Sequence, residues 1–172
     1  SCNYHQLNPK TMHKFKTTNI KGKDYVEVNQ RLLYFRNEPT FAGWSIESDL
    51  VDLQPDRCCI KAMIRDADGR IWILDVVRGQ YDTDQRDKVI KQTAALDGRG
   101  IRIRLPQDPG QAGKSQAMHM LRLLHGSAVT VLPVTGSKDV RAEPFASQVA
   151  GGNVYMVAAD WNRTLLDEMR TF

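Results

Sequence analysis

Apolar and polar residues alternate at short range in the first half of the chain. Trp44–Leu53 alternates roughly with a period of two, and Arg57–Ile64 is rich in strand formers. Ile71–Val77 is apolar throughout except for Asp75. Between the last two runs, Asp66–Gly69 is typical of a hairpin turn, because glycine accepts the positive φ that such turns need. These patterns predict three neighbouring strands in an antiparallel meander.

After residue 82, segments of helical periodicity alternate with strands. Thr83–Leu96 starts with a capping residue, Asp82 or Thr83 itself, and Gly98 ends it. Strands that alternate with helices pair in parallel through right-handed crossovers. The predicted fold class is therefore α/β, with a mixed sheet in which an antiparallel hairpin meander precedes β-α units and flanking helices. The later elements are expected as strand Ile101–Leu105, helix Lys114–His125, strand Ala128–Val134, polar loop Thr135–Arg141, helix Ala142–Ala150, strand Asn153–Val157 and helix Asp160–Phe172.

The N-terminal residues 1–23 are polar and rich in lysine, which predicts a basic leader or flexible arm. Such an arm could contact nucleic acid or be a solvated tail. Asp24–Asn37 has apolar residues at intervals of three and four, the stripe of a surface helix, and Pro39 ends it. Residues 24–172 are expected to form a single domain. No apolar run approaches the roughly 20 residues that cross a bilayer.

The composition excludes few functions. The formal net charge of +4 weakly favours a polyanionic partner. The three cysteines, Cys2, Cys58 and Cys59, match neither a disulfide framework nor a zinc site. We expect reduced thiols.

Gln107–Ser115 joins a predicted strand to a predicted helix, the placement of a phosphate loop. Gly113-Lys114-Ser115 fits that motif, but Asp108 occupies the position of its leading glycine. A carboxylate there would repel the phosphates that the loop should bind. The sequence therefore disfavours nucleotide hydrolysis.

Asp108 is better suited to hold a metal. A carboxylate at the end of a strand can join others around Mg²⁺ or Mn²⁺, which prefer oxygen ligands. Asp75 is the second candidate for a catalytic or metal-binding role, because a buried carboxylate is costly unless it is paired or bound to metal. The alternatives are that Asp75 points to solvent and that Asp108 caps a turn.

Several cations could contact a phosphate backbone. The predicted loop Thr135–Arg141 contains Lys138 and Arg141 together with two hydroxyl side chains. Lys114 and Arg78 could extend this DNA-binding surface. The alternative is an ordinary solvated loop.

The strongest signal is a set of short sequence runs, spread in order over more than half of the chain, that match a known family. From about Asp66 onward, these runs resemble the C-terminal nuclease domain of tailed-phage large terminase subunits. The resembling runs are Ile73–Gly79, Leu105–Lys114, Thr135–Lys138, Val140–Ala146, Gly152–Val154 and Trp161–Asn162.

This resemblance implies an RNase H-like fold and a metal-dependent nuclease that cuts concatemeric phage DNA during packaging. Mg²⁺ or Mn²⁺ is the implied cofactor. DNA and other packaging-motor subunits are the implied partners, with no membrane and no defined oligomeric state, and the cytoplasm of a bacterial host is the implied location. Asp108 corresponds to the middle acid of the family's site.

Two other acids of the family pattern are missing. Gly43-Trp44-Ser45 has serine where the family favours aspartate, and Asp49 or Asp52 could substitute. The late Asp-rich motif would come just after Phe172. Pro106 stands where relatives often have glutamate. The resemblance thus leaves open a domain that is inactive because flanking acids are missing.

Residues 23–69 more weakly resemble a phage or plasmid protein that handles single-stranded DNA. A seam between two origins would then lie near residues 66–70. The alternative function is a non-catalytic single-stranded DNA-binding or annealing module, and a third is an assembly protein without a DNA role. The module would need exposed aromatic rings for base stacking, for which the candidates are Tyr25, Tyr34, Phe35, Trp44 and Trp72.

Overall fold

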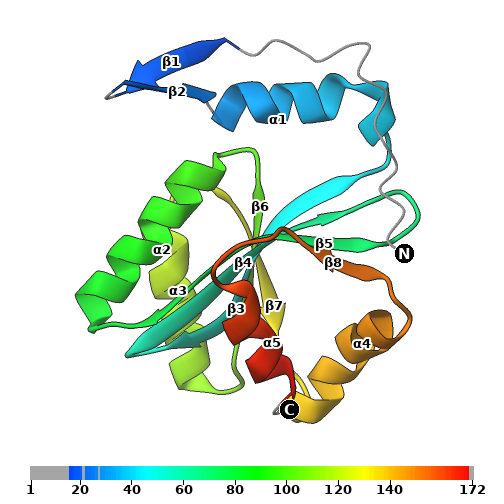
Figure 1. Cartoon of the computed structure of the whole chain (residues 1–172). Helices are drawn as coiled ribbons and strands as arrows, with labels where there is room; N and C mark the ends of the chain where they lie inside the picture. The colour runs from blue at the N-terminus through cyan, green and yellow to red at the C-terminus, as the bar shows by residue number, and fades with distance from the viewer. Residues whose placement is uncertain (1–15, 21, 27, 171–172) are drawn as a thin grey trace.

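The computed structural model describes residues 16–20, 22–26 and 28–170 (Figure 1). A six-stranded sheet has the order β7-β6-β3-β4-β5-β8. Helices α2 and α3 cover one face, and α4 and α5 lie on the other. The sheet strands are β3 (Ser45–Gln54), β4 (Arg57–Arg65), β5 (Ile71–Gln80), β6 (Arg102–Gln107), β7 (Ala128–Pro133) and β8 (Val154–Met156). The helices of this body are α2 (Thr83–Asp97), α3 (Gln111–Leu123), α4 (Lys138–Ala150) and α5 (Asn162–Arg170).

Strand direction confirms the predicted mixed sheet. β3, β4 and β5 form the antiparallel meander, with Leu50 opposite Ile60 and Ile60 opposite Val77. β6 pairs in parallel with β3 and with β7, and β8 pairs in parallel with β5. Every strand of this sheet except β4 therefore runs in the same direction. The carboxyl ends of β3, β5, β6, β7 and β8 all point to one edge of the sheet, which we call the carboxyl edge.

The apolar core lies between the sheet and the helices α2 and α3. Alternate residues of β3, β4 and β6 point toward these helices, as the period of two requires. On the helix side, Ile90 of α2 and Met120 of α3 pack in the same core and have almost no exposed surface. The core cluster comprises Leu50, Leu53, Cys58, Ile60, Ile90, Ile103, Leu105, Ala117, Met120 and Leu124.

The opposite face of the sheet is more polar. Asp49 lies opposite Lys61, and Arg104 Nε is 3.4 Å from Asp49 Oδ1. Burial raises the pKa of Asp49 and lowers that of Lys61. The ring of Phe145 in α4 stacks over this layer, with Lys61 Nζ 4.7 Å from its centroid. A charged layer thus separates the sheet from α4.

The N-terminal part lies beyond the edge at which β3 and β6 begin (Figure 1). β1 (Thr17–Ile20) and β2 (Lys23–Val26) form a separate hairpin, followed by α1 (Val28–Asn37) and the short helix η2 (Pro39–Phe41). The helix predicted from Asp24 begins only at Val28, and residues 24–26 belong to β2, so the expectation for those residues was wrong. Gly22, at φ +81°, allows the tight turn that directs this segment into a strand. The rest of the expected leader, residues 1–15, lies outside the described residues.

Other boundaries differ from the prediction near turns. β6 continues to Gln107, and α3 begins at Gln111 rather than Lys114. α4 begins at Lys138, so the predicted loop ends at its N-cap, Ser137, whose side chain accepts from the Val140 amide at 3.4 Å. Pro144 lies inside α4 rather than near its start.

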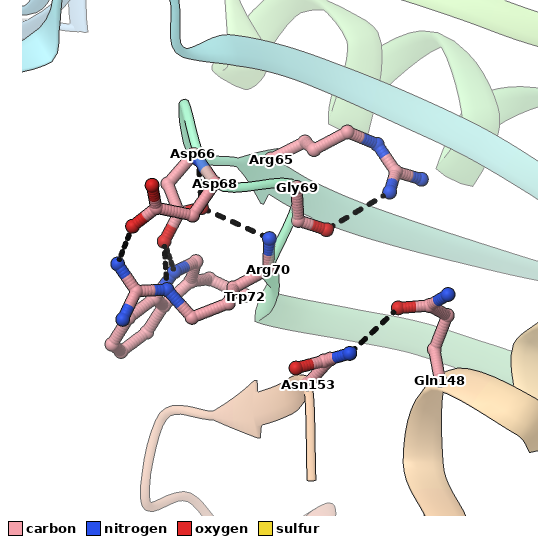
Figure 2. A network of polar contacts seen from close by, with 8 residues as sticks. All are labelled: Arg65, Asp66, Asp68, Gly69, Arg70, Trp72, Gln148 and Asn153. Carbon is pink, nitrogen blue, oxygen red and sulfur yellow. Dashed lines mark hydrogen bonds and ion pairs between the residues drawn. The ribbon is translucent and has the colours of Figure 1, made fainter. Parts of the chain in front are cut away.

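The turn between β4 and β5 is organised around the buried carboxylate of Asp66 (Figure 2). Asp66 Oδ1 accepts the amides of Asp68 and Arg70 at 3.1 and 2.9 Å. Its Oδ2 accepts Arg70 Nε at 2.8 Å and the Trp72 indole at 3.1 Å. Burial opposes ionisation, but these hydrogen bonds outweigh it and hold the pKa of Asp66 below its ordinary value.

The Leu105 side chain should be a major source of stability, because it is 0% exposed in β6, which is paired on both sides. We expect Leu105→Ala to lower the free energy of unfolding by about 2–5 kcal/mol, measured by urea denaturation. The control Leu96→Ala, where the side chain is 69% exposed, should change it by less than about 0.5 kcal/mol. Equal effects of the two substitutions would contradict this core.

Asp66 should make folding acid-sensitive. Because its folded-state pKa is depressed, its contribution is fully present above the unfolded pKa of about 4 and is lost as pH falls through the lower folded pKa. The Asp66→Asn protein should therefore lose less stability than the wild type as pH falls from about 5 to about 2, a range that brackets that pKa. Thermal melts measure the difference. Parallel pH profiles of the two proteins would count against this role.

Candidate active site

Asp108 follows β6 directly at the carboxyl edge, and the backbone around it requires glycine. Gly110 has φ +90° and precedes α3. A Cβ added to the buried Gly113 would lie 2.0 Å from the Asp108 carbonyl oxygen, so the first turn of α3 packs directly on the Asp108 backbone. The two glycines fix the strand-to-helix turn, and the Asp108 side chain is left exposed.

Asp52 lies near the carboxyl end of β3, the strand that pairs with β6. β3 and β6 pair with Asp49 opposite Arg104. The described pairing ends there and a bulge between Leu50 and Asp52 follows, so Asp52 lies near the level of the last residues of β6, just before Asp108. Gln116 in α3 also donates to the Leu53 carbonyl at 3.1 Å, which ties the end of β3 to the helix that follows Asp108.

Arg57 occupies one oxygen of the Asp52 carboxylate. Its Nε donates to Asp52 Oδ2 at 2.8 Å, and this hydrogen bond raises the pKa of Arg57. Both side chains keep more than a third of their surface exposed. The pair lies at the carboxyl edge, because Arg57 begins the one strand that runs the other way.

Asp75 lies elsewhere. It is opposite Ala62, which is itself opposite Ser48, so Asp75 is level with Ile103 rather than with Asp108. Three strand spacings of about 4.8 Å separate β5 from β6. The Asp75 side chain is exposed, and its charge adds to the burial that raises the pKa of Asp97. The structure does not bring the two predicted metal ligands together.

The predicted DNA-binding residues lie on elements at the carboxyl edge. Lys114 is exposed in the first turn of α3. Arg141 is exposed in the first turn of α4, with its Nε 3.4 Å from the Ser137 carbonyl. Lys138 begins α4, but its side chain lies outside the described part. Arg78, near the end of β5, forms an ion pair with Glu168 of α5.

Cys59 lies between Asp52 and Arg78 in the sheet. Burial, reinforced by the Glu168 charge, raises its pKa to about 11. The thiol is therefore protonated at neutral pH and a poor nucleophile. Cys58 and Cys59 are both free, consistent with reduced thiols.

The aromatic candidates for base stacking are mostly engaged with one another. Phe41 lies 5.1 Å from Phe35 and 5.0 Å from Trp44, measured between ring centroids. Tyr34 packs edge-on against Phe41. At the outer edge of the sheet, Trp72 stacks on Tyr155 with centroids 4.4 Å apart. The side chain of Tyr25 is outside the described residues.

The acids of the carboxyl edge suit a hard divalent cation. Mg²⁺ usually binds through one or two carboxylates and keeps several waters, and Asp52 and Asp108 are the candidates for that donor set. Within the described residues, no group of three or more potential ligands is gathered closely enough to hold a metal. Sequence reasoning named Asp52 only as a substitute for Ser45. The signal for it was the position of Asp52 near the end of a predicted strand, three residues before Pro55.

Comparison with known proteins identifies the family. The sequence profile of the Terminase RNaseH-like domain matches residues 48–172. The chain therefore belongs to the terminase RNase H-like domain family. The match begins at Ser48, within β3, so it includes Asp52 and Asp108 but not Ser45.

The solved structure of the P22 large terminase nuclease domain has a similar fold. Its TM-score is 0.51 at 12% sequence identity, over 74% of this chain and 68% of that one. This similarity confirms the predicted RNase H-like fold. No curated protein matches the chain. In the described part of the chain, no helix is long and apolar enough to cross a membrane.

Gly113→Ala tests the close packing at the Asp108 turn, because helix propensity and packing would change the free energy of unfolding in opposite directions. Helix propensity alone favours alanine by about 1 kcal/mol. The contact with the Asp108 carbonyl instead predicts destabilisation of about 1–3 kcal/mol by overpacking. Chemical denaturation measures the change. The matched change Ala112→Gly, on the exposed side of the same turn, should cost no more than about 1 kcal/mol. A stabilised Gly113→Ala protein would refute the close packing.

Proposed function

We propose that this domain hydrolyses DNA phosphodiesters at the carboxyl edge, using a divalent cation held by Asp52 and Asp108. The observation that supports this most directly is that β3 and β6 pair in parallel, with Asp52 near the carboxyl end of β3 and Asp108 directly after β6. A bound Mg²⁺ or Mn²⁺ would activate a water and stabilise the charge that develops on the phosphate.

The protein side chains have separate tasks in this proposal. Asp108 presents its carboxylate from a turn fixed by Gly110 and Gly113. Asp52 Oδ2 accepts from Arg57, and Oδ1, which accepts from Gln54 Nε2 at 3.5 Å, would be the oxygen that faces the cation. Arg57 also places a guanidinium beside the acids, where it can face a DNA phosphate.

The cations of α3 and α4 would bind the DNA backbone on either side of the acids. Lys114 and Arg141 are exposed in the first turns of these helices, where the helix dipole adds positive potential. Lys138 would join them. Arg78 would have to leave Glu168 to reach a phosphate, so it is the weakest of the set.

The setting follows from the family. We propose phage DNA as the substrate, other packaging-motor subunits as partners and the host cytoplasm as the location. The Glu168 side chain lies on the same face as Cys59 and Asp52 and is the nearest candidate on α5 for a further acid. The alternative, a non-catalytic single-stranded DNA module, has less support because most of its candidate rings pack on other aromatic rings of the chain.

Nicking of supercoiled plasmid in Mn²⁺ tests the proposal. Asp52→Asn and Asp108→Asn should each reduce the rate by at least roughly 100-fold, the loss expected when several kcal/mol of metal-ion catalysis are removed. The control Asp68→Asn, in the hairpin turn at the other edge, should nick at the wild-type rate.

Other outcomes separate the alternatives. Loss of nicking in Asp75→Asn with retention in Asp52→Asn would refute the assignment of Asp52. Salt-sensitive oligonucleotide binding by the wild type without any cleavage, unchanged in Asp108→Asn, would favour the binding module.

A further inference from the structure

The turn that joins β3 to β4 is held from outside at every carbonyl from Leu53 to Asp56. The donors come from α2, from α3 and from the segment before α2, far along the chain from the turn. Few tight turns have every exposed acceptor fixed in this way, since water normally satisfies some of them. The bonds are Gln116 Nε2 to Leu53 O at 3.1 Å, Arg86 Nη1 to Gln54 O at 2.8 Å, Thr83 Oγ1 to Pro55 O at 3.2 Å and the Tyr81 amide to Asp56 O at 2.8 Å.

The sequence of this turn explains why it needs such support. Gln54 pairs with Arg57, so Pro55 and Asp56 form a two-residue hairpin loop. The favoured two-residue loops need a positive φ at the first position, and proline is fixed near −65°. The loop therefore lacks the backbone geometry that matches the twist of its strands. The hydrogen bonds from the helices and from Tyr81 therefore hold the loop in a conformation that its own residues do not favour.

Arg86 is the most constrained of these donors. It lies in α2 with 4% of its surface exposed. Its Nε and Nη2 donate to Asp87 Oδ1 at 3.0 and 2.6 Å, which leaves Nη1 directed at the Gln54 carbonyl. The other oxygen of Asp87 lies 2.5 Å from His119 Nε2 in α3. The guanidinium is thus aligned by a carboxylate that is itself held by the neighbouring helix.

We propose that Arg86 is a positioning residue for the metal site, acting through the β3–β4 turn on Asp52. Asp52 lies two residues before Gln54, whose carbonyl Arg86 binds, and directly after the bulge in β3 between Leu50 and Asp52. Among the described residues, β3 pairs with β6 only as far as Asp49, so at Asp52 the strand is paired with β4 alone. The hydrogen bonds to the turn set its distance from Asp108. This inference rests on the proposed function.

Mn²⁺ binding measured by electron paramagnetic resonance, without DNA, tests the proposal. Arg86→Met keeps an apolar side chain of similar length in the buried site and removes its hydrogen bonds. It should bind Mn²⁺ at least about tenfold more weakly, as loss of outer-shell partners typically does. Gln116→Leu, which removes only the bond to Leu53, should weaken binding in the same direction with less risk to folding.

The matched control is Arg36→Met. Arg36 Nη2 donates to the Gly100 carbonyl at 2.6 Å, so the same substitution removes an arginine–carbonyl bond at the opposite edge of the sheet. Its Mn²⁺ affinity should equal that of the wild type. In the Asp52→Asn background, Arg86→Met should cause no further loss, because its effect passes through Asp52. Circular dichroism at the assay temperature establishes that each variant is folded.

The outcomes distinguish the two proposals. Wild-type binding that persists unchanged in folded Arg86→Met and Gln116→Leu would overturn the positioning role and leave the metal site standing. The positioning role would also be overturned if Arg86→Met lowered the Mn²⁺ affinity as much in the Asp52→Asn background as in the wild type. Absence of Mn²⁺ binding by the wild type would overturn the metal site and the positioning role together.

Discussion

The parallel pairing of β6 with β3 on one side and with β7 on the other is the interaction on which the candidate site depends. It is maintained by Ile103 and Leu105, which point into the core against α2 and α3. Because side chains alternate along a strand, a slip of one residue would turn these two outward and expose the apolar row. The same register fixes where β3 and β6 end relative to each other. Core packing therefore decides which acids become neighbours.

The segment after β6 shows how similar sequence patterns can serve different chemistry. A phosphate loop uses glycines so that backbone amides can surround an anion. In this chain Gly110 and Gly113 let α3 pack against the Asp108 backbone. The Asp108 carboxylate is thereby placed just before the start of α3, where its negative charge attracts cations. The resemblance to a phosphate loop is thus limited to the close approach of backbone that glycine permits.

Most of the fold could be predicted because the apolar periodicity within each strand is local information. The meander, the later β-α units and the mixed sheet all followed from it. The starts of α3 and α4 were missed, because Gly110 has no capping side chain and Pro144 is accommodated within α4. The sequence alone does not favour Asp52, which we propose as a ligand, over Asp49 or Asp75. That choice depends on the register between β3 and β6 and on the face toward which each acid points, both of which are long-range properties.

The order of strands in the sheet also has a consequence for the assembly of the domain. β3, β4 and β5 contact one another through short turns, whereas Glu47 meets Arg102 only after the chain has passed through α2. Contacts between distant segments form more slowly than local ones, because a longer loop must close. Asp52 thus belongs to the early-folding hairpin and Asp108 to the strand that joins later. A partly folded chain has only half of the acidic pair, so any DNA-cleaving capacity would arise only once the central sheet is complete.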